Sequence, residues 1–100
     1  MEILFNEQDL IDSICVYTSL RENITPEQVQ ADIGYDLESG FSASSLAHGR
    51  TLRFNEQDII DAVADYLQEY HLFGPDSLNI KFSYLEQDGI AAVIQVNNYY

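Results

Sequence analysis

One eight-residue segment of this chain occurs twice. Residues 5–12 (FNEQDLID) recur at residues 54–61 (FNEQDIID), an offset of 49 positions. The same offset, without a gap, aligns Tyr17 with Tyr66, Tyr35 with Tyr84 and Gly40 with Gly89. A chain of 100 residues with 46% hydrophobic content suits one compact core. We therefore predict a single domain made of two pseudo-symmetric repeats, at about residues 2–50 and 51–100.

Each copy of the segment has the features of a helix start. Asn6 is the expected N-cap, Glu7 and Asp9 fall in the positively polarised first turn, and Phe5 can pack onto Leu10. Behind each start, apolar residues recur at helical spacing: Leu10, Ile11, Ile14, Tyr17 and Thr18, then Ile59, Ile60, Val63, Tyr66, Leu67 and Tyr70. The pattern predicts one helix in each half, with one buried face.

After each helix the pattern changes to strict alternation, which is typical of strands. The inner positions are expected to be Val29, Ala31, Ile33, Tyr35 and Leu37 in the first half, and Leu78, Ile80, Phe82 and Tyr84 in the second. We predict three-residue loops with Gly40 and Gly89 in the left-handed conformation, because this register turns Phe41 and Ile90 inward. A tight turn at His48-Gly49 then leads into Arg50–Phe54.

The repeat also predicts a strand at the beginning of the chain. Ile3–Phe5 corresponds to Leu52–Phe54 and needs Ile90–Val96 as its partner, either within one chain or in a swapped dimer. The expected fold is α+β, a two-layer αββ tandem repeat. It has one antiparallel sheet of four main strands plus short edge strands, with two helices on one face.

The charge of the chain restricts its partners. Seventeen acids against four bases give a net charge of −13, which repels nucleic acids and anionic membrane surfaces and favours a basic protein or a cation. Cys15 is the single cysteine, so no internal disulfide can form. The chain start lacks a basic, apolar leader, and no apolar run approaches the length of about 20 residues that spans a membrane. We expect a cytoplasmic protein.

The segment from Asn6 to Tyr17, followed by the turn Gly40-Phe41-Ser42-Ala43, resembles a small family of uncharacterised cytoplasmic proteins from Gram-positive spore-forming bacteria. The resemblance covers most of the chain. It implies a bacterial cytosolic origin, and it brings neither an activity nor site residues.

Few residues suit catalysis. The helix-start carboxylates Glu7, Asp9 and Asp12, with their copies Glu56, Asp58 and Asp61, could bind a hard metal ion, but the helix dipole alone favours acids there. His48 and His71 do not align in the repeat, and Cys15 has mostly acids near it in the sequence. No nucleophile elbow or glycine-rich phosphate loop occurs. Enzyme activity is therefore the less favoured interpretation, and we assign neither a cofactor nor a metal site.

The outer face of the expected sheet is the candidate site. It carries Leu46, Leu85, Ala91 and Val93 beside the basic residues Arg53 and Lys81. Such a mixed patch is typical of protein interfaces and predicts a small acidic interaction module, homodimeric or bound to a basic protein. Two alternatives stay open: an acidic mimic of nucleic acid that binds a basic protein, and a small metal-binding protein or enzyme that uses the helix-start carboxylates.

Overall fold

The computed structural model describes residues 2–71 and 78–96. Along the chain the elements are β1 (Glu2–Phe5), α1 (Glu7–Glu22), the short 3-10 helix η1 (Pro26–Gln28), β2 (Gln30–Asp36), β3 (Gly40–Ala47), β4 (Arg50–Phe54), α2 (Glu56–His71), β5 (Leu78–Leu85) and β6 (Gly89–Val96). The strands form two three-stranded antiparallel sheets, in the orders β1-β6-β5 and β2-β3-β4. The fold is α+β, as predicted.

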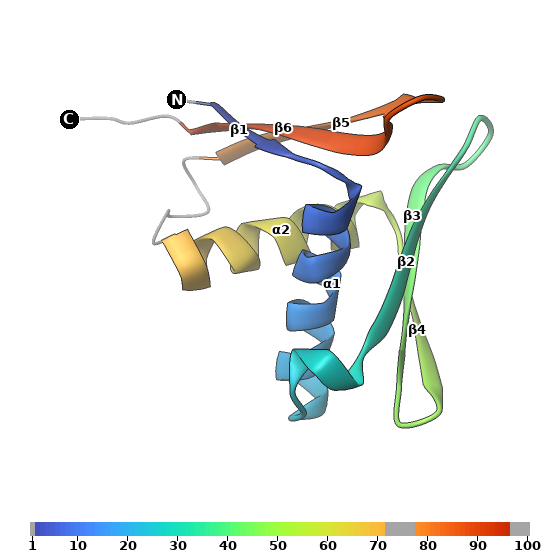
Figure 1. The fold of residues 1–100 in the computed structure, drawn as a ribbon, viewed down its shortest axis with the longest axis vertical. Helices are drawn as coiled ribbons and strands as arrows, with labels where there is room; N and C mark the ends of the chain where they lie inside the picture. Colours follow the sequence, from blue (N-terminus) through green and yellow to red (C-terminus); the bar gives the residue numbers. More distant parts are fainter. Residues whose placement is uncertain (1, 72–77, 97–100) are drawn as a thin grey trace.

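The expected single sheet with four main strands was wrong. The two sheets stand at a steep angle to each other, and α1 and α2 fill the corner between them (Figure 1). A continuous sheet would require an edge strand of one sheet to pair with an edge strand of the other. Instead, Tyr35 of β2 and Tyr84 of β5 stack by their rings where the two hairpins meet. The hairpins therefore meet through side chains rather than through backbone hydrogen bonds.

The predicted pairing of the first strand with the last is confirmed, and it occurs within one chain. Glu2 lies opposite Gln95 and Phe5 opposite Ala92, so β1 completes the sheet of the β5-β6 hairpin. In the same way β4 pairs with β3 and completes the sheet of the β2-β3 hairpin. Each half of the chain thus contributes its first strand to the hairpin of the other half.

Both helix starts have the predicted N-cap, and each is closed by a reciprocal pair of hydrogen bonds. The Asp9 backbone N–H donates to Asn6 Oδ1 (2.8 Å), and the Asn6 N–H donates to Asp9 Oδ2 (2.9 Å). Asn55 and Asp58 make the same two bonds at 2.8 and 3.0 Å. A capping box satisfies two backbone donors that the helix itself leaves free.

Replacing either cap residue by alanine should destabilise the protein. We expect Asn6→Ala and Asn55→Ala each to lower the free energy of unfolding by about 0.5–2 kcal/mol, measured by urea denaturation. The matched controls Asn6→Asp and Asn55→Asp keep an oxygen acceptor and should change it by a few tenths at most. Equal losses in the alanine and aspartate variants would contradict a capping role.

The loop length and the left-handed glycines of the predicted turns are confirmed, but each loop begins one residue earlier than predicted, at Leu37 instead of Glu38 and at Glu86 instead of Gln87. Asp36 pairs with Gly40 and Leu85 with Gly89 across three-residue loops, and both glycines have positive φ, 79° and 77°. This register places Ile90 in the core. His48 and Gly49 form a two-residue turn with φ of 55° and 72°, a type that matches the twist of a hairpin.

The core lies between the two helices and the inner faces of both sheets. Its buried residues are Phe5, Leu10, Ile14, Ala43, Phe54, Ile59, Ala62, Val63, Leu67, Ile90, Ala92, Ile94 and Val96. The helical faces predicted from the sequence supply five of them. Leu37 was predicted to point inward and is instead 90% exposed, because it lies in the loop beyond the last paired residue of β2.

Candidate binding surfaces

The structure distributes the six predicted interface residues over two sheets. Leu46 and Arg53 lie on β3 and β4, whereas Lys81 and Leu85 lie on β5, and Ala91 and Val93 on β6. The outer faces of the two sheets point in different directions (Figure 1). The six residues therefore do not form one continuous patch.

The outer face of the β1-β6-β5 sheet is the more apolar of the two. Leu4 is 72% exposed there and Leu85 58% exposed, and Ala91 and Val93 are partly exposed between them. Leu4 lies opposite Val93, which in turn lies opposite Lys81. We call this surface the apolar sheet face; its outward positions are Glu2, Leu4, Asn79, Lys81, Ser83, Leu85, Ala91, Val93 and Gln95. The sequence analysis missed Leu4, although the inward positions of Ile3 and Phe5 imply by alternation that Leu4 points outward.

The outer face of the β2-β3-β4 sheet is polar. Asp32, Ser44 and Arg53 form one row across the three strands, and Gln30, Leu46 and Thr51 form the next. A shallow hollow of about 300 Å³ lies over Gly34, where no atom would contact an added Cβ. Leu46 is therefore an isolated apolar residue on this face.

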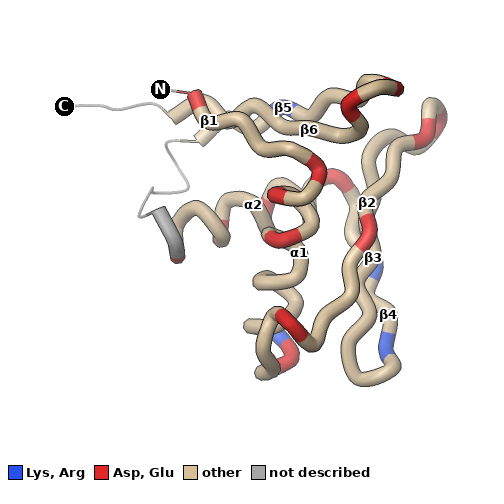
Figure 2. The backbone as a smooth tube through the Cα atoms, viewed as in Figure 1, with Lys and Arg blue, Asp and Glu red and all other residues tan. Residues whose placement is uncertain are grey.

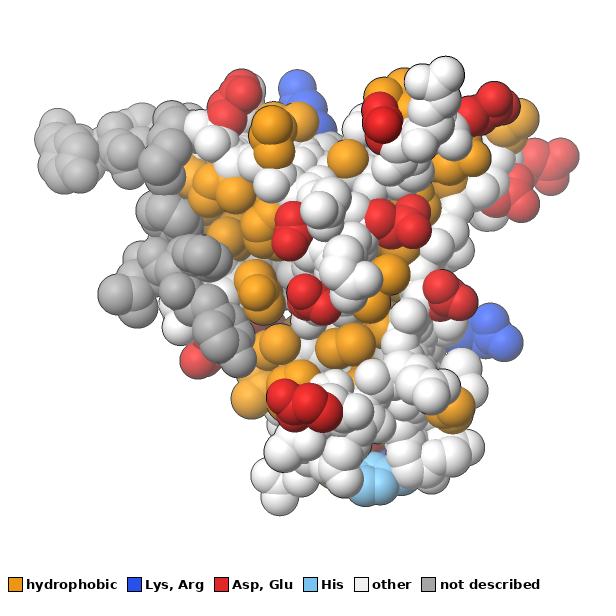
Figure 3. Space-filling view, in the orientation of Figure 1, with side chains coloured by type: hydrophobic (Ala, Val, Ile, Leu, Met, Phe, Trp, Pro, Cys, Tyr) orange, Lys and Arg blue, Asp and Glu red, His pale blue; other side chains and the backbone are white. Residues whose placement is uncertain are grey.

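A third surface lies where the tips of the two hairpins meet. The rings of Tyr35 and Tyr84 stack with centroids 5.1 Å apart and an interplanar angle of 17°. A cleft of about 730 Å³ opens beside them, which we call the hairpin-tip cleft; it is lined by Tyr35, Asp36, Leu37, Glu38, Tyr84 and Glu86. Acidic residues mark both hairpin tips along the backbone (Figure 2), and hydrophobic side chains accompany them on the surface (Figure 3). None of the lining residues is basic.

Sequence reasoning did not identify this cleft. It placed Tyr35 and Tyr84 on the inner faces of their strands, yet they are 38% and 45% exposed. Both tyrosines lie near the tips of their hairpins. These tips extend beyond the helices (Figure 1). The matching positions of the two tyrosines in the repeat were the available signal.

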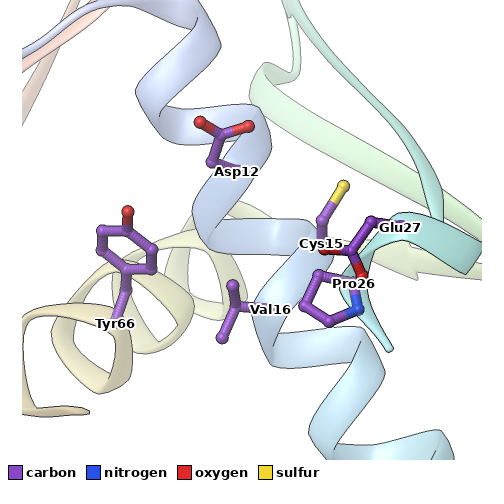
Figure 4. A pocket seen from close by; sticks show the side chains of 6 residues that line it. All are labelled: Asp12, Cys15, Val16, Pro26, Glu27 and Tyr66. Atoms are coloured by element: carbon purple, nitrogen blue, oxygen red, sulfur yellow. The ribbon is translucent and has the colours of Figure 1, made fainter. Parts of the chain in front are cut away.

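A smaller groove of about 360 Å³ lies beside Cys15 (Figure 4). It is lined by Asp12, Cys15 and Val16 of α1, Pro26 and Glu27 of η1, and Tyr66 of α2. The Cys15 thiol donates to the carbonyl of Val29, with a sulfur-to-oxygen distance of 3.7 Å. Burial raises the pKa of Cys15, and the negative charge of Asp12 raises it further. The thiol is thus held protonated, which is unsuitable for a nucleophile.

Five of the six helix-start carboxylates act as hydrogen-bond acceptors within the fold. Asp9 and Asp58 cap the helices, and Glu7 Oε1 accepts the backbone N–H of Ile90 at 3.1 Å. Asp12 and Asp61 each accept a side-chain amide from the glutamine one turn earlier, at 2.9 and 3.0 Å. Within residues 2–71 and 78–96, no group of three or more His, Cys, Asp or Glu side chains is arranged to hold a metal ion.

The two histidines lie in different parts of the fold. His48 is exposed in the turn between β3 and β4. The backbone of His71 ends α2, and its side chain lies outside the described residues.

Comparison with known proteins places the chain in a family. Over 98 residues it is 33% identical to a Bacillus subtilis (strain 168) protein described as "Uncharacterized protein YxcD", and the match covers 97% of this chain and 96% of that protein. No solved structure matches. In the part of the chain that the structure describes, no helix has both the length and the apolar composition needed to cross a membrane. Residues 1–98 match the family described as "Protein of unknown function (DUF2653)", and the chain belongs to this uncharacterised bacterial family.

Proposed function

We propose that this protein is a non-enzymatic interaction module that self-associates through its apolar sheet face. One observation carries the proposal: this face is almost neutral in a chain of net charge −13. Its nine outward positions include one acid, Glu2, and one base, Lys81. Exposed apolar side chains at Leu4 and Leu85 then supply the surface that a contact can bury.

The distribution of charge favours a second copy as the occupant. Every other acid among the described residues lies outside these nine outward positions, and salt screens exposed charges that lie farther apart than about 10 Å at 0.1 M ionic strength. A twofold axis parallel to β6 sets β5 of one copy over β1 of the other. Lys81 of each copy then approaches the edge that carries Glu2, so the two charged groups attract across the contact.

Light scattering tests the dimer. We expect a dimeric mass for the native protein at micromolar concentration and a monomeric mass for Val93→Asp, because the variant places an unpaired charge in the contact. The dissociation constant should rise at least about 30-fold, equivalent to ~2 kcal/mol. Ser44→Asp is the matched control: it adds an acid at the aligned position of the other central strand, and its mass should stay dimeric.

Two results would contradict self-association through this face. The first is a monomeric mass for the native protein at high concentration and moderate salt. The second is equal dissociation in Val93→Asp and Ser44→Asp, which would trace the effect to added charge rather than to the face. Urea denaturation of both variants distinguishes loss of assembly from loss of folding.

The order of the elements supports a further part of the proposal, that the domain arose by duplication of a strand-helix-strand-strand unit. Both halves have this order, the same capping box and a glycine with positive φ at the same hairpin position.

The cytoplasm is the proposed location, since Cys15 is a free thiol and suits a reducing compartment. The nucleic-acid mimic stays an alternative, supported by the net charge.

A further inference from the structure

The hairpin-tip cleft combines two aromatic rings with acidic side chains from both hairpins. Tyr35 and Tyr84 stack on each other, and Phe41 packs against Tyr35, with its ring centroid 4.7 Å from that of Tyr35 and 5.4 Å from that of Phe82. Phe41 and Phe82 pack against the hydrophobic core. The tyrosine rings are therefore supported from inside the protein, while much of their surface stays open to solvent.

The carboxylates of the cleft are available to a ligand. Asp36 Oδ1 accepts the backbone N–H of Glu38 at 2.8 Å and so stabilises the loop. Among the described residues, no hydrogen bond or ion pair engages the carboxylates of Glu38 and Glu86. The one ion pair between described residues joins Arg50 to Glu22, and neither of these lines the cleft. Acids without basic neighbours create a negative potential that attracts a cationic group.

We propose that the hairpin-tip cleft binds an arginine-bearing segment of a basic partner protein. This binding is separate from self-association, which uses the outer face of the β1-β6-β5 sheet. The planar guanidinium can lie against the exposed tyrosine rings and donate hydrogen bonds to the carboxylates of Glu38 and Glu86. A volume of about 730 Å³ is within the range of clefts that hold side chains or small ligands.

Arginine fits this cleft better than lysine or a metal ion. Its guanidinium is weakly hydrated, stacks on aromatic rings and binds carboxylates through two parallel hydrogen bonds, whereas an ammonium group is a strongly hydrated point charge. A metal ion would gain nothing from the tyrosine faces. Leu37, which is almost fully exposed at the edge of the cleft, adds an apolar contact for the aliphatic part of the partner segment.

Fluorescence anisotropy with short labelled peptides tests the proposal. Three probes share one glycine-serine framework and carry three arginines, three lysines or three citrullines, the last being neutral and equal in shape to arginine. At 0.1 M salt we expect the arginine peptide to bind at least threefold more tightly than the lysine peptide, and the citrulline peptide not to bind.

Variants locate the binding site. The double variant Glu38→Gln with Glu86→Gln should weaken the arginine peptide at least tenfold. The matched control Glu27→Gln with Glu69→Gln removes the same two charges from exposed positions on η1 and α2, and should weaken it less than threefold. Tyr84→Leu should reduce the preference for arginine over lysine to near unity.

Three outcomes would overturn the proposal. One is absence of binding by the arginine peptide at millimolar protein concentration. Another is equal weakening in the two glutamine double variants, which is the result expected if any acidic surface attracts the peptide, as in a nucleic-acid mimic. The third is equal affinity for arginine and lysine peptides that Tyr84→Leu does not alter, since the rings would then take no part. Urea denaturation confirms that each variant is folded at the assay temperature.

Discussion

Deletion of residues 1–4 is expected to lower the free energy of unfolding by about 3–5 kcal/mol, the sum of lost core packing and lost strand hydrogen bonds. The deletion removes most of β1, whose residues pair with β6 from Glu2 opposite Gln95 to Leu4 opposite Val93. It also removes Ile3, which packs against the core. Because a domain of this size is stable by only about 5–15 kcal/mol, the urea midpoint should fall strongly.

Two point variants in the same strand control for this deletion. Ile3→Ala should cost about 2 kcal/mol, since its side chain contacts the core, whereas the exposed Leu4→Ala should change stability by less than about 0.5 kcal/mol. Leu4→Ala should instead weaken the proposed dimer. A truncated protein that unfolds at the same urea concentration as the full chain would show that the pairing of β1 with β6 contributes nothing.

The second large effect is expected at the two repeat-related phenylalanines. Phe54→Ala should cost about 3–5 kcal/mol, because the ring is buried and makes an edge contact with Tyr17, 6.0 Å between centroids at 68°. Phe5 is equally buried and contacts Tyr66, 6.0 Å away at 83°. Each ring thus joins the first strand of one half to the helix of the other, and Phe5→Ala should cost a similar amount in a urea titration.

Milder variants keep this test informative if the alanine proteins do not fold. Phe54→Leu preserves an apolar side chain and should cost about 1.5 kcal/mol or less. A double-mutant cycle of Phe54→Leu with Tyr17→Leu should give a coupling energy of about 0.5–1.5 kcal/mol for the aromatic pair. Strictly additive effects would mean that the ring contact adds nothing beyond burial.

Local structure could be predicted because its signals lie within a few residues. The cap at Asn6, its copy at Asn55, and the left-handed glycines Gly40 and Gly89 each depend on their immediate neighbours. The pairing of β1 with β6 joins strands that are far apart in the sequence. It could still be predicted, because in the repeat it corresponds to the pairing of β4 with β3, which are adjacent in the sequence. The internal repeat of the sequence thus provided the information about a contact between distant residues that local patterns lack.

The division into two sheets could not be read from the sequence. The alternation of apolar and polar residues indicates which side of a strand is buried. This pattern is the same whether the two hairpins share one sheet or form two separate sheets. The buried pair Thr18 and Ser45, joined by a 2.9 Å hydrogen bond between hydroxyls, was likewise unexpected. The aligned positions hold Leu67 and Ile94, so the two halves fill equivalent core sites by different means.

The candidate surfaces depend on that same division. If all strands formed a single sheet, Leu46 and Val93 would belong to one patch. In the two sheets of the structure they lie on separate faces. The hairpin-tip cleft exists because the two hairpins approach each other at their tips, which no property of either hairpin alone specifies. Charge and exposed tyrosines indicate its chemistry only after the structure has brought them together.

The exchange of first strands bears on how the protein is synthesised. The β2-β3-β4 sheet uses residues 30–54, so a nascent chain can assemble it while the ribosome is still adding residues. The other sheet pairs Glu2 with Gln95, so Ile3 and Phe5 of β1 have no strand partner until the segment that forms β6 has been synthesised. We expect the joining of β1 to β6 to be a late event of folding. During this interval the nascent chain offers an unpaired strand edge to chaperones and to neighbouring nascent chains.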